Sequence, residues 1–385
     1  MKSEEKNISS QPGIYVHIPF CERKCGYCDF YSVTALSRKT PFVQMLIKEM
    51  TLTAESMASE EIFDTIYFGG GTPSLLTPRE LEILLQTLQS RFKLAPDCEI
   101  TLEANPGTVD LEKFSGFYQS GINRLSMGIQ SFDDEKLKAL GRIHSADEAC
   151  LAIEAAKGAG FTNFNLDLMF ALPNQTVEQA LADVEQALYF SPPHLSHYQL
   201  TLEPSTPFYK NPPPLPEEDL AWEMQLACQA RIKNAHYDHY EVSGFAQKNR
   251  QCKHNVNYWQ YGDYIGLGAG AHGKITVPPE GKIWRTQMPA SPGGYIEEMK
   301  RPQPGRQILV SEHDACFEFM LNALRLQEGF DLSLFEQRTG LPRSAIEGGV
   351  KIMQEKGWRM VSEPNYLKLT TKGRHYLNDV VSLFL

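Results

Sequence analysis

Short apolar runs alternate with amphipathic stretches over the first 235 residues. The first run, residues 13–18, is rich in β-branched side chains and is stopped by Pro19, which favours a buried strand. Residues 39–57 then carry apolar side chains at helical spacing. The same reasoning predicts strands at 63–68, 98–104, 124–129, 164–170 and 197–202, and helices at 78–92, 110–120, 133–140, 146–157, 176–190 and 217–234. Strands that alternate with helices predict parallel βαβ units, which form either a doubly wound sheet or a barrel.

Polar residues gather where these predicted strands end. Three cysteines follow the first strand, three glycines follow the second, and Glu103 ends the third. Gln130 ends the fourth strand, and Asp167 lies late in the fifth. Barrels and doubly wound sheets both place their chemistry at the carboxyl ends of the strands. The pattern therefore predicts a site at that edge and leaves both architectures open.

The pattern changes beyond residue 234. Residues 236–264 are crowded with aromatic side chains, and residues 273–306 are rich in Pro and Gly, with a hairpin-like turn at 277–281. We expect a domain boundary near residue 305. Helices at 311–326, 332–338 and 344–356, two short strands around 363–365 and a helix from 371 to the end then predict a small winged-helix-like domain. Because residues 306–385 carry ten basic and ten acidic side chains, they lack the basic stripe of a nucleic-acid interface and are interpreted as a lid or partner surface.

Composition narrows the class of protein. A length of 385 residues predicts two domains, and a net charge of -10 argues against binding to nucleic acid or to an anionic membrane surface. There is no run of about 18 or more apolar residues to span a membrane. Residues 1–12 form a polar stretch, interpreted as a flexible tail without a secretory signal. Eight cysteines in such a chain indicate a reducing compartment, so we expect a cytoplasmic protein.

The densest cluster of reactive side chains is formed by Cys21, Cys25 and Cys28. A loop of this size can direct three sulfurs at one centre, and iron–sulfur clusters are held by thiolates grouped in this way. A [4Fe–4S] cube normally takes four thiolates, so three would leave one iron open. A zinc site and packed free thiols remain alternatives. A fourth ligand could come from any of the five other cysteines: Cys98, Cys150, Cys228, Cys252 and Cys316.

The run YVHIPFCERKCGYC, residues 15–28, resembles the CxxxCxxC motif of radical S-adenosylmethionine (SAM) proteins. Its flanks resemble the branch that contains oxygen-independent coproporphyrinogen dehydrogenases and HemW-type haem chaperones. The resemblance implies an α/β fold: an incomplete (β/α)6 radical-SAM barrel over residues 13–235, an extension over 236–305, and a small C-terminal winged-helix-like domain over 306–385. It also implies that Cys21, Cys25 and Cys28 hold three irons of a [4Fe–4S] cluster, whose fourth iron is chelated by the amino and carboxylate groups of SAM.

The resemblance further assigns SAM contacts to residues near the predicted strand ends. From the residues alone, the glycines suit either a tight turn or a close approach of the backbone to a ligand, and Glu103 suits either a structural ion pair or a functional site. Gln130 suits a satisfied buried amide, and Arg142 an exposed helix end. Asp167 is more informative, because it interrupts an apolar strand. The positions that match the family's SAM contacts are Tyr15, Tyr27, Gly70, Gly71, Thr72, Glu103, Gln130, Arg142 and Asp167.

Two positions separate the members of this branch. The dehydrogenases carry a further cysteine two residues after the third, where this chain has Phe30, as HemW-type proteins do. The HNxxYW pattern resembles their haem motif and implies haem contacts by His254, Tyr258 and Trp259, with Cys252 as an alternative axial ligand. From the residues alone, this segment suits an aromatic loop packed on the barrel.

The leading hypothesis is thus a haem chaperone with a SAM-coordinated [4Fe–4S] cluster that passes haem, its cargo, to acceptor haemoproteins. The resemblance leaves room for a homodimer and for peripheral membrane contact through the acceptor. The alternative is an oxygen-independent coproporphyrinogen III oxidase of porphyrin biosynthesis, in which a 5′-deoxyadenosyl radical abstracts hydrogen from a propionate side chain. Whether the chain is an enzyme is therefore open. A zinc-containing regulatory protein is a third, weaker hypothesis.

Overall fold

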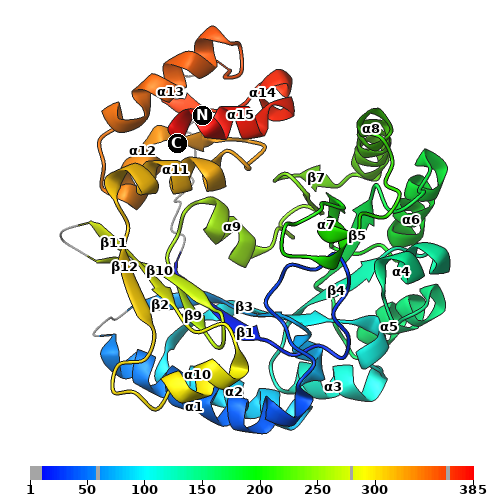
Figure 1. Ribbon diagram of the computed structural model, residues 1–385, viewed down its shortest axis with the longest axis vertical. Helices are drawn as coiled ribbons and strands as arrows, with labels where there is room; N and C mark the ends of the chain where they lie inside the picture. The colour runs from blue at the N-terminus through cyan, green and yellow to red at the C-terminus, as the bar shows by residue number, and fades with distance from the viewer. Residues whose placement is uncertain (1–10, 58–60, 278–280, 361–364) are drawn as a thin grey trace.

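The computed structural model describes residues 11–57, 61–277, 281–360 and 365–385 (Figure 1). Its centre is a twelve-stranded sheet of order β12-β11-β10-β9-β1-β2-β3-β4-β5-β6-β8-β7. Six successive strands pair in parallel: β1 (Gly13–Ile18), β2 (Ile62–Gly70), β3 (Lys93–Ala104), β4 (Arg124–Gln130), β5 (Phe164–Phe170) and β6 (His194–Gln199). Because β12 and β7 remain the two ends of this order, the sheet forms an incomplete barrel, as the resemblance implied.

Helices cover the outer face of these strands (Figure 1). Several begin where the sequence supplies a cap: Thr77, Ser145 and Thr176 each form a capping box with the residue three positions on. The helices of this part are α1 (Lys39–Ser56), α2 (Pro78–Arg91), α3 (Leu111–Gln119), α4 (Asp134–Leu140), α5 (Ala146–Gly158), α6 (Val177–Tyr189), the short α7 (Pro207–Lys210) and α8 (Glu218–Asn234).

The sixth strand begins earlier than predicted. The sequence predicts residues 197–202, whereas β6 covers His194–Gln199. It pairs with β5 from Asn165↔His194 to Phe170↔Gln199. His194 is buried there, and its ring nitrogens lie 2.7 Å from Asn165 Oδ1 and 2.8 Å from Tyr240 Oη. A polar residue with both ring nitrogens partnered can begin a buried strand, which the apolar pattern alone did not indicate.

Strand pairing stacks the inward side chains in layers. Tyr15, Tyr67, Thr101 and Arg124 lie in register across β1 to β4 and form the floor layer, below which Gly13, Thr65 and Glu99 are also in register. The next layer towards the carboxyl ends contains Glu103, Ser126 and Asn165, and Asp167 pairs with Ser196 above them. Gln130, the last residue of β4, lies at the top. Layers of this kind fill barrel interiors and order the side chains from floor to mouth.

Residues 236–305 extend the barrel sheet at both edges. At one edge they add β7 (Asp238–His239) and β8 (Gly244–Ala246). At the other edge they add β9 (Tyr264–Leu267), β10 (His272–Val277) and β11 (Lys282–Gln287), and β12 (Arg306–Leu309) follows. β10 and β11 form the expected hairpin, and residues 278–280 of its predicted turn lie outside the described residues. Because β12 pairs with β11, the sheet continues four residues past the predicted boundary near 305.

Two helices lie within this extension, α9 (Lys253–Trp259) and α10 (Pro292–Glu298). The segment with the HNxxYW pattern is therefore helical, and its interpretation as a loop was wrong. Cys252 precedes the first turn of α9. In Figure 1 this helix lies between the barrel and the C-terminal domain.

The C-terminal domain has its own apolar core. Its elements are α11 (Glu312–Ala323), β13 (Phe330–Asp331), α12 (Leu332–Thr339), α13 (Ser344–Glu355), β14 (Tyr366–Leu367), α14 (Thr371–His375) and α15 (Leu377–Val381). β13 pairs with β14. An isolated bridge joins Arg359 to Leu369, which lie before and after the two strands expected around 363–365. Residues 363 and 364 themselves lie outside the described residues. The last helix, predicted to be continuous, breaks at Tyr376, whose backbone leaves the helical region (φ -103°, ψ 34°).

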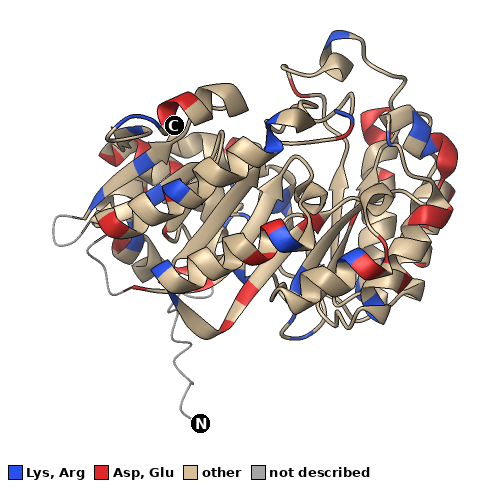
Figure 2. Cartoon of the chain, turned by 90° about the horizontal axis from the view of Figure 1, so that it is seen from below, with Lys and Arg blue, Asp and Glu red and all other residues tan. Residues whose placement is uncertain are grey.

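Most of the charged residues fall on the helices and loops around the barrel, and fewer on its strands (Figure 2). None of the helices in the described part of the chain is both long and apolar enough to cross a membrane.

Candidate functional site

The three clustered cysteines lie on the loop that leaves the carboxyl end of β1. Cys21 is buried, and Thr72 Oγ1 donates to its sulfur at 3.4 Å. Burial, with a smaller contribution from the neighbouring Cys25 and Cys21 sulfurs, raises the pKa of the Cys28 thiol to about 11, because a second negative charge nearby would be unfavourable. The three thiols are thus close enough to influence one another.

The surroundings of the cysteines suit a group larger than one ion. Within the described residues, no set of three His, Cys, Asp or Glu side chains is placed to hold a single metal ion. In a [4Fe–4S] cube each thiolate binds a different iron, so the sulfurs need not converge on one point. Gly71 keeps space beside them, since a Cβ there would lie 2.6 Å from Phe20 O and 3.0 Å from Cys21 Sγ. The residues present therefore fit such a cluster.

The five other cysteines are distributed over different elements. Cys98 is on β3, Cys150 on α5, Cys228 on α8, Cys252 before α9 and Cys316 on α11. Neither of the two cavities beside the cluster loop is lined by any of them.

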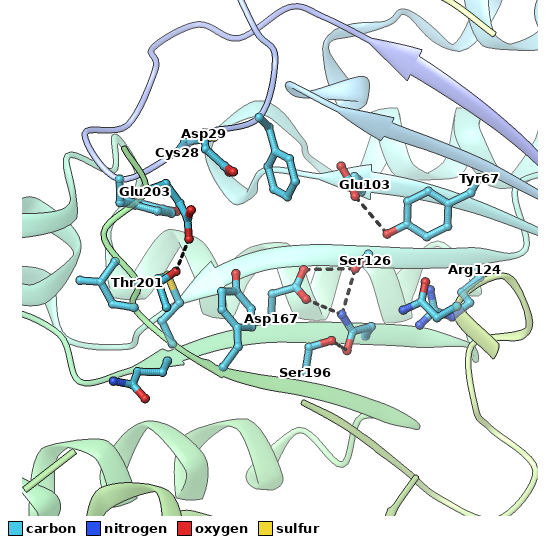
Figure 3. A pocket seen from close by; sticks show the side chains of 18 residues that line it. Cys28, Asp29, Tyr67, Glu103, Arg124, Ser126, Asp167, Ser196, Thr201 and Glu203 are labelled. Carbon is cyan, nitrogen blue, oxygen red and sulfur yellow. Dashed lines mark hydrogen bonds between the residues drawn. The ribbon is translucent and has the colours of Figure 1, made fainter. Parts of the chain in front are cut away.

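A cavity of about 150 Å³ lies between the cluster loop and the strand ends. Its wall includes Cys28 and Phe30 together with eight of the nine residues that the resemblance assigns to SAM: Tyr27, Gly70, Gly71, Thr72, Glu103, Gln130, Arg142 and Asp167. A second cavity, of about 380 Å³, shares five of these residues, Tyr27, Cys28, Phe30, Glu103 and Asp167, and continues into the barrel (Figure 3). The parallel strands have thus brought residues from four different turns to one place.

Two carboxyl groups in this wall are partly buried. Tyr67 Oη donates to Glu103 Oε1 at 3.0 Å, and Gly70 N donates to Oε2 at 3.1 Å. Burial, and secondarily the charge of Asp167, raises the pKa of Glu103 to about 7. Burial also raises the pKa of Asp167, although Asn165 and Ser126 donate to its two oxygens at 2.8 and 3.1 Å. Both side chains are held as acceptors that face the cavity (Figure 3).

Gln130 and Arg142 close the upper wall. Tyr198 Oη donates to Gln130 Oε1 at 2.8 Å, and the backbone of Gln130 has a positive φ of 71°, which turns the chain at the end of β4. Arg142 Nη2 donates to Gly128 O at 2.7 Å, while Nε is buried without a hydrogen-bond partner among the described residues. An unpaired donor on a buried guanidinium suits an acidic ligand group.

Tyr15 is the exception among the nine. It lines neither cavity and lies in the floor layer, where its hydroxyl is 3.0 Å from His17 Nδ1 and its ring stacks on Tyr67. A Cβ at Gly69 would touch Tyr15, Tyr67 and Glu103 at once. The geometry therefore places Tyr15 next to Glu103 through packing, without a face on the cavity.

The predicted haem residues lie at the opposite end of the barrel from the cysteines. His254 Nδ1 is 2.8 Å from Thr65 Oγ1, and Thr65 is in register with Gly13, the first residue of β1. The His254 ring is 2% exposed and stacks on Tyr67, with ring centroids 5.1 Å apart. Its Nε2 is buried and, within the described residues, has no hydrogen-bond partner. Burial, and then the charge of Arg124, lowers its pKa to about 3, so the imidazole is neutral at neutral pH.

Tyr258 and Trp259 do not form an open face with His254. The Tyr258 ring contacts His254 on one side and Tyr264 on another, with centroids 5.1 and 4.3 Å away. The guanidinium of Arg325, from the C-terminal domain, lies over the Trp259 ring at 4.4 Å. Of the residues on α9, Asn255 reaches the wall of the larger cavity. The helix is thus positioned between the barrel interior and the small domain.

Several residues of this site were not singled out from the sequence: Tyr67, Arg124, Ser126, Asn165, Ser196 and Tyr198. A signal for them existed. Polar residues lie two positions apart on β4, at Arg124 and Ser126, and on β5, at Asn165 and Asp167. A period of two places such residues on one face of a strand, and in a barrel one face is the interior.

Comparisons with known proteins agree with this architecture. Residues 15–187 match the Radical SAM superfamily, and residues 310–376 match the HemN C-terminal domain. The chain is similar to the solved coproporphyrinogen III oxidase (HemN) of Escherichia coli, a radical SAM enzyme, with a TM-score of 0.82 over 97% of this chain and 90% of that chain. The identity is 22%, so this likeness concerns the fold.

Sequence relatives are more specific. Heme chaperone HemW of Escherichia coli (strain K12) is 42% identical over 379 residues, which cover 97% of both chains. Heme chaperone HemW of Bacillus subtilis (strain 168) is 33% identical over 380 residues, 96% of this chain and 98% of the relative. With this identity over nearly its whole length, and with both matching domains in order, the chain belongs to the HemW family of haem chaperones in the radical SAM superfamily.

Proposed function

We propose that this protein binds haem and delivers it to acceptor haemoproteins, and that it carries a [4Fe–4S] cluster with SAM on the open iron. The observation that carries the cofactor part is the cavity beside Cys28, whose wall unites eight of the nine expected SAM-contacting residues. The 42% identity to heme chaperone HemW of Escherichia coli, over 97% of the chain, supports haem binding.

Cys21, Cys25 and Cys28 are the residues that would hold the cluster. When bound, such a cluster supplies a reducible centre with one iron available to SAM. The chain's own contribution is to shield and orient: Gly71 leaves room beside Cys21, Arg142 offers an unpaired Nε–H for a carboxylate, and Glu103 and Asp167 offer acceptors for amino and hydroxyl groups.

The proposed axial ligand of the haem iron is His254. Its neutral imidazole and its Nε2 without a partner among the described residues suit metal coordination, since imidazole binds metals in the neutral form. Because the ring is buried, loading requires α9 to move. Tyr258 and Trp259, on the same helix, are the proposed aromatic contacts, and Cys252 is the alternative ligand.

Anaerobic purification followed by iron, sulfide and SAM quantification tests the cluster. Four irons per chain should be lost in Cys28→Ala and retained in Cys150→Ala, a cysteine on the outer helix α5. Iron that persists in Cys28→Ala, or that disappears when one of the five other cysteines is replaced, contradicts a three-cysteine site.

Haem titration tests the chaperone part. The protein should give a stoichiometric Soret band that weakens in His254→Ala and not in His313→Ala, whose histidine is exposed on α11. Isotopically labelled haem should then move to an apo-haemoprotein. Formation of protoporphyrinogen from coproporphyrinogen III under reducing anaerobic conditions, without haem binding, would instead support the oxidase.

A further inference from the structure

Arg124 lies on the floor of the barrel and faces the larger cavity. Its side chain is the first of β4 and is 2% exposed, yet it lines the same cavity as Cys28 (Figure 3). A guanidinium has five donor hydrogens and stays charged, so burial demands several acceptors. Arg124 Nε is buried without a hydrogen-bond partner among the described residues.

The carboxylate nearest to Arg124 neutralises it incompletely. Glu99 Oε2 is 3.9 Å from Arg124 Nε, longer than a hydrogen bond. The other oxygen, Glu99 Oε1, accepts from His254 N at 3.3 Å and from the Cys252 thiol at 3.6 Å. Glu99 therefore makes its hydrogen bonds to the start of α9, and Arg124 Nε keeps a donor for another anion.

The charged residues around the cavity favour one orientation of an anionic ligand. Arg124 is the one Lys or Arg among the described residues that line it, whereas four lining residues are acidic: Asp29, Glu103, Asp167 and Glu203. Asp29 and Glu203 lie beside the cluster loop, away from Arg124 (Figure 3). An anionic group is therefore repelled along the upper wall and attracted at the floor.

The distance from floor to mouth suits a large ligand. Six residues separate Arg124 from Gln130 along β4, roughly 20 Å of extended chain. A molecule with its carboxylate at Arg124 can therefore reach the cluster loop. Arg–carboxylate pairs form two parallel hydrogen bonds, which also fix orientation. Haem carries two propionate carboxylates on one edge of a flat macrocycle.

We propose that Arg124 anchors a propionate carboxylate of haem inside the barrel. This inference rests on the proposed function and adds a binding residue to it, at the end of the barrel where α9 and His254 lie. Arg124 then acts as a binding residue that the sequence motifs did not identify.

Esterification of the ligand tests the proposal without changing the protein. Haem and haem dimethyl ester are titrated into the wild-type protein in the same detergent, with the Soret band as readout. Loss of a charge-assisted hydrogen-bond pair weakens binding by about 10-fold to 100-fold. We expect the ester to bind more weakly by a factor of that size. Equal affinities would overturn the proposal.

Substitution tests it from the protein side. The Arg124→Gln variant should bind haem more weakly than the wild type, whereas its affinity for haem dimethyl ester should change little. The two ligands should then bind the variant with similar affinity. Arg124→Lys, which keeps the charge without the fork geometry, should retain part of the difference. Arg285→Gln is the matched control, because Arg285 is a largely buried arginine paired with a carboxylate, Glu318, that lines neither cavity.

SAM also carries a carboxylate, which could pair with Arg124 in place of a haem propionate. Equilibrium dialysis of SAM against the reconstituted Arg124→Gln variant should give wild-type affinity. Lost SAM affinity with unchanged haem affinity overturns the inference. Absence of haem binding by the wild-type protein refutes the proposed function itself, whereas haem binding that ignores both esterification and Arg124→Gln refutes the role of Arg124 alone. If the Arg124→Gln variant does not fold, the titration of wild-type protein with haem and its dimethyl ester still tests whether a propionate carboxylate is anchored.

Discussion

Arg142 Nη1 lies 3.9 Å from the sulfur of Cys25, so one guanidinium touches the cluster loop and lines the cofactor cavity. These two residues are 117 positions apart in the chain. Arg142 is fixed by the hydrogen bond from Nη2 to Gly128 O at 2.7 Å. The contact therefore joins the cysteine loop to the wall of the cavity.

Replacing Arg142 by Gln should separate SAM binding from cluster binding. The variant loses a charged donor for the SAM carboxylate, and we expect SAM affinity to fall by about 10-fold or more. Iron content should stay near that of the wild type, because all three cysteines remain. Equilibrium dialysis with labelled SAM and iron analysis measure the two effects. Unchanged SAM affinity would show that the cavity wall does not use this residue.

Gly71→Ala should impair cluster assembly. The added Cβ would lie 2.6 Å from Phe20 O, a backbone atom that cannot move away easily. Overpacking of this kind costs about 1–3 kcal/mol, and here it also displaces the Cys21 sulfur. We expect less iron and sulfide per chain after anaerobic reconstitution.

The matched control is Gly348→Ala on α13, where a Cβ meets nothing within 4 Å. That variant should raise the free energy of unfolding by about 0.5–1 kcal/mol, because Ala favours the helix, and should leave iron content unchanged. Equal iron content in both variants would contradict the space-keeping role of Gly71.

Arg325→Ala should speed haem loading. The Arg325 guanidinium covers Trp259 at 4.4 Å and pairs with Glu241 at 3.6 Å, and so fastens the end of α9 to the C-terminal domain. A cation–π contact of this kind contributes about 0.5–2 kcal/mol, so its loss should increase opening of α9 by roughly 2-fold to 30-fold. Stopped-flow haem binding and amide hydrogen exchange over residues 253–259 measure the change.

The control for this variant is Arg343→Ala, an arginine of the same domain that pairs with Glu336 at the surface. Arg343→Ala should change neither the rate of haem binding nor the rate of amide hydrogen exchange over residues 253–259. Faster exchange in α9 without faster haem binding would show that this helix does not gate His254.

Glu49→Gln should change how stability depends on pH. Glu49 is buried and accepts from Gly268 N at 2.8 Å and Tyr295 Oη at 2.7 Å. Burial raises the pKa of its carboxyl to about 7. Between about pH 4.5 and pH 7 the unfolded chain has released this proton while the folded chain still holds it, so the free energy of unfolding falls as pH rises.

The size of this effect is a few kcal/mol, from about 1.4 kcal/mol per unit of pKa difference. Glu49→Gln removes it, so the variant should gain stability relative to the wild type between pH 5 and pH 8. Urea unfolding of the apoprotein at several pH values measures the difference, and Glu336→Gln, at an exposed site, is the control. A constant difference across this range would show that Glu49 is ionised in the folded protein.

The alternation of apolar runs with amphipathic stretches was enough to place five of the six parallel strands and the helices between them. It succeeds because buried parallel strands and one-sided helices have different periods, which the sequence displays directly. It also placed Glu103, Gln130 and the cysteines near one edge, because parallel strands all end on the same side. The spacing of three cysteines and the Phe30 position then indicated the family.

Only the tertiary structure decided which residues from distant parts of the chain meet inside the barrel and beneath it. His254 meets Thr65 across 189 residues of sequence, which puts the predicted haem motif under the barrel floor, away from the cysteines. Arg124 meets Glu99 and lines one cavity with Asn165 because β4 lies between β3 and β5, and β12 joins the sheet through pairing with β11. Local pattern records which face of an element is buried, but it holds no information about which distant element covers that face, because that choice is made by packing of the whole chain.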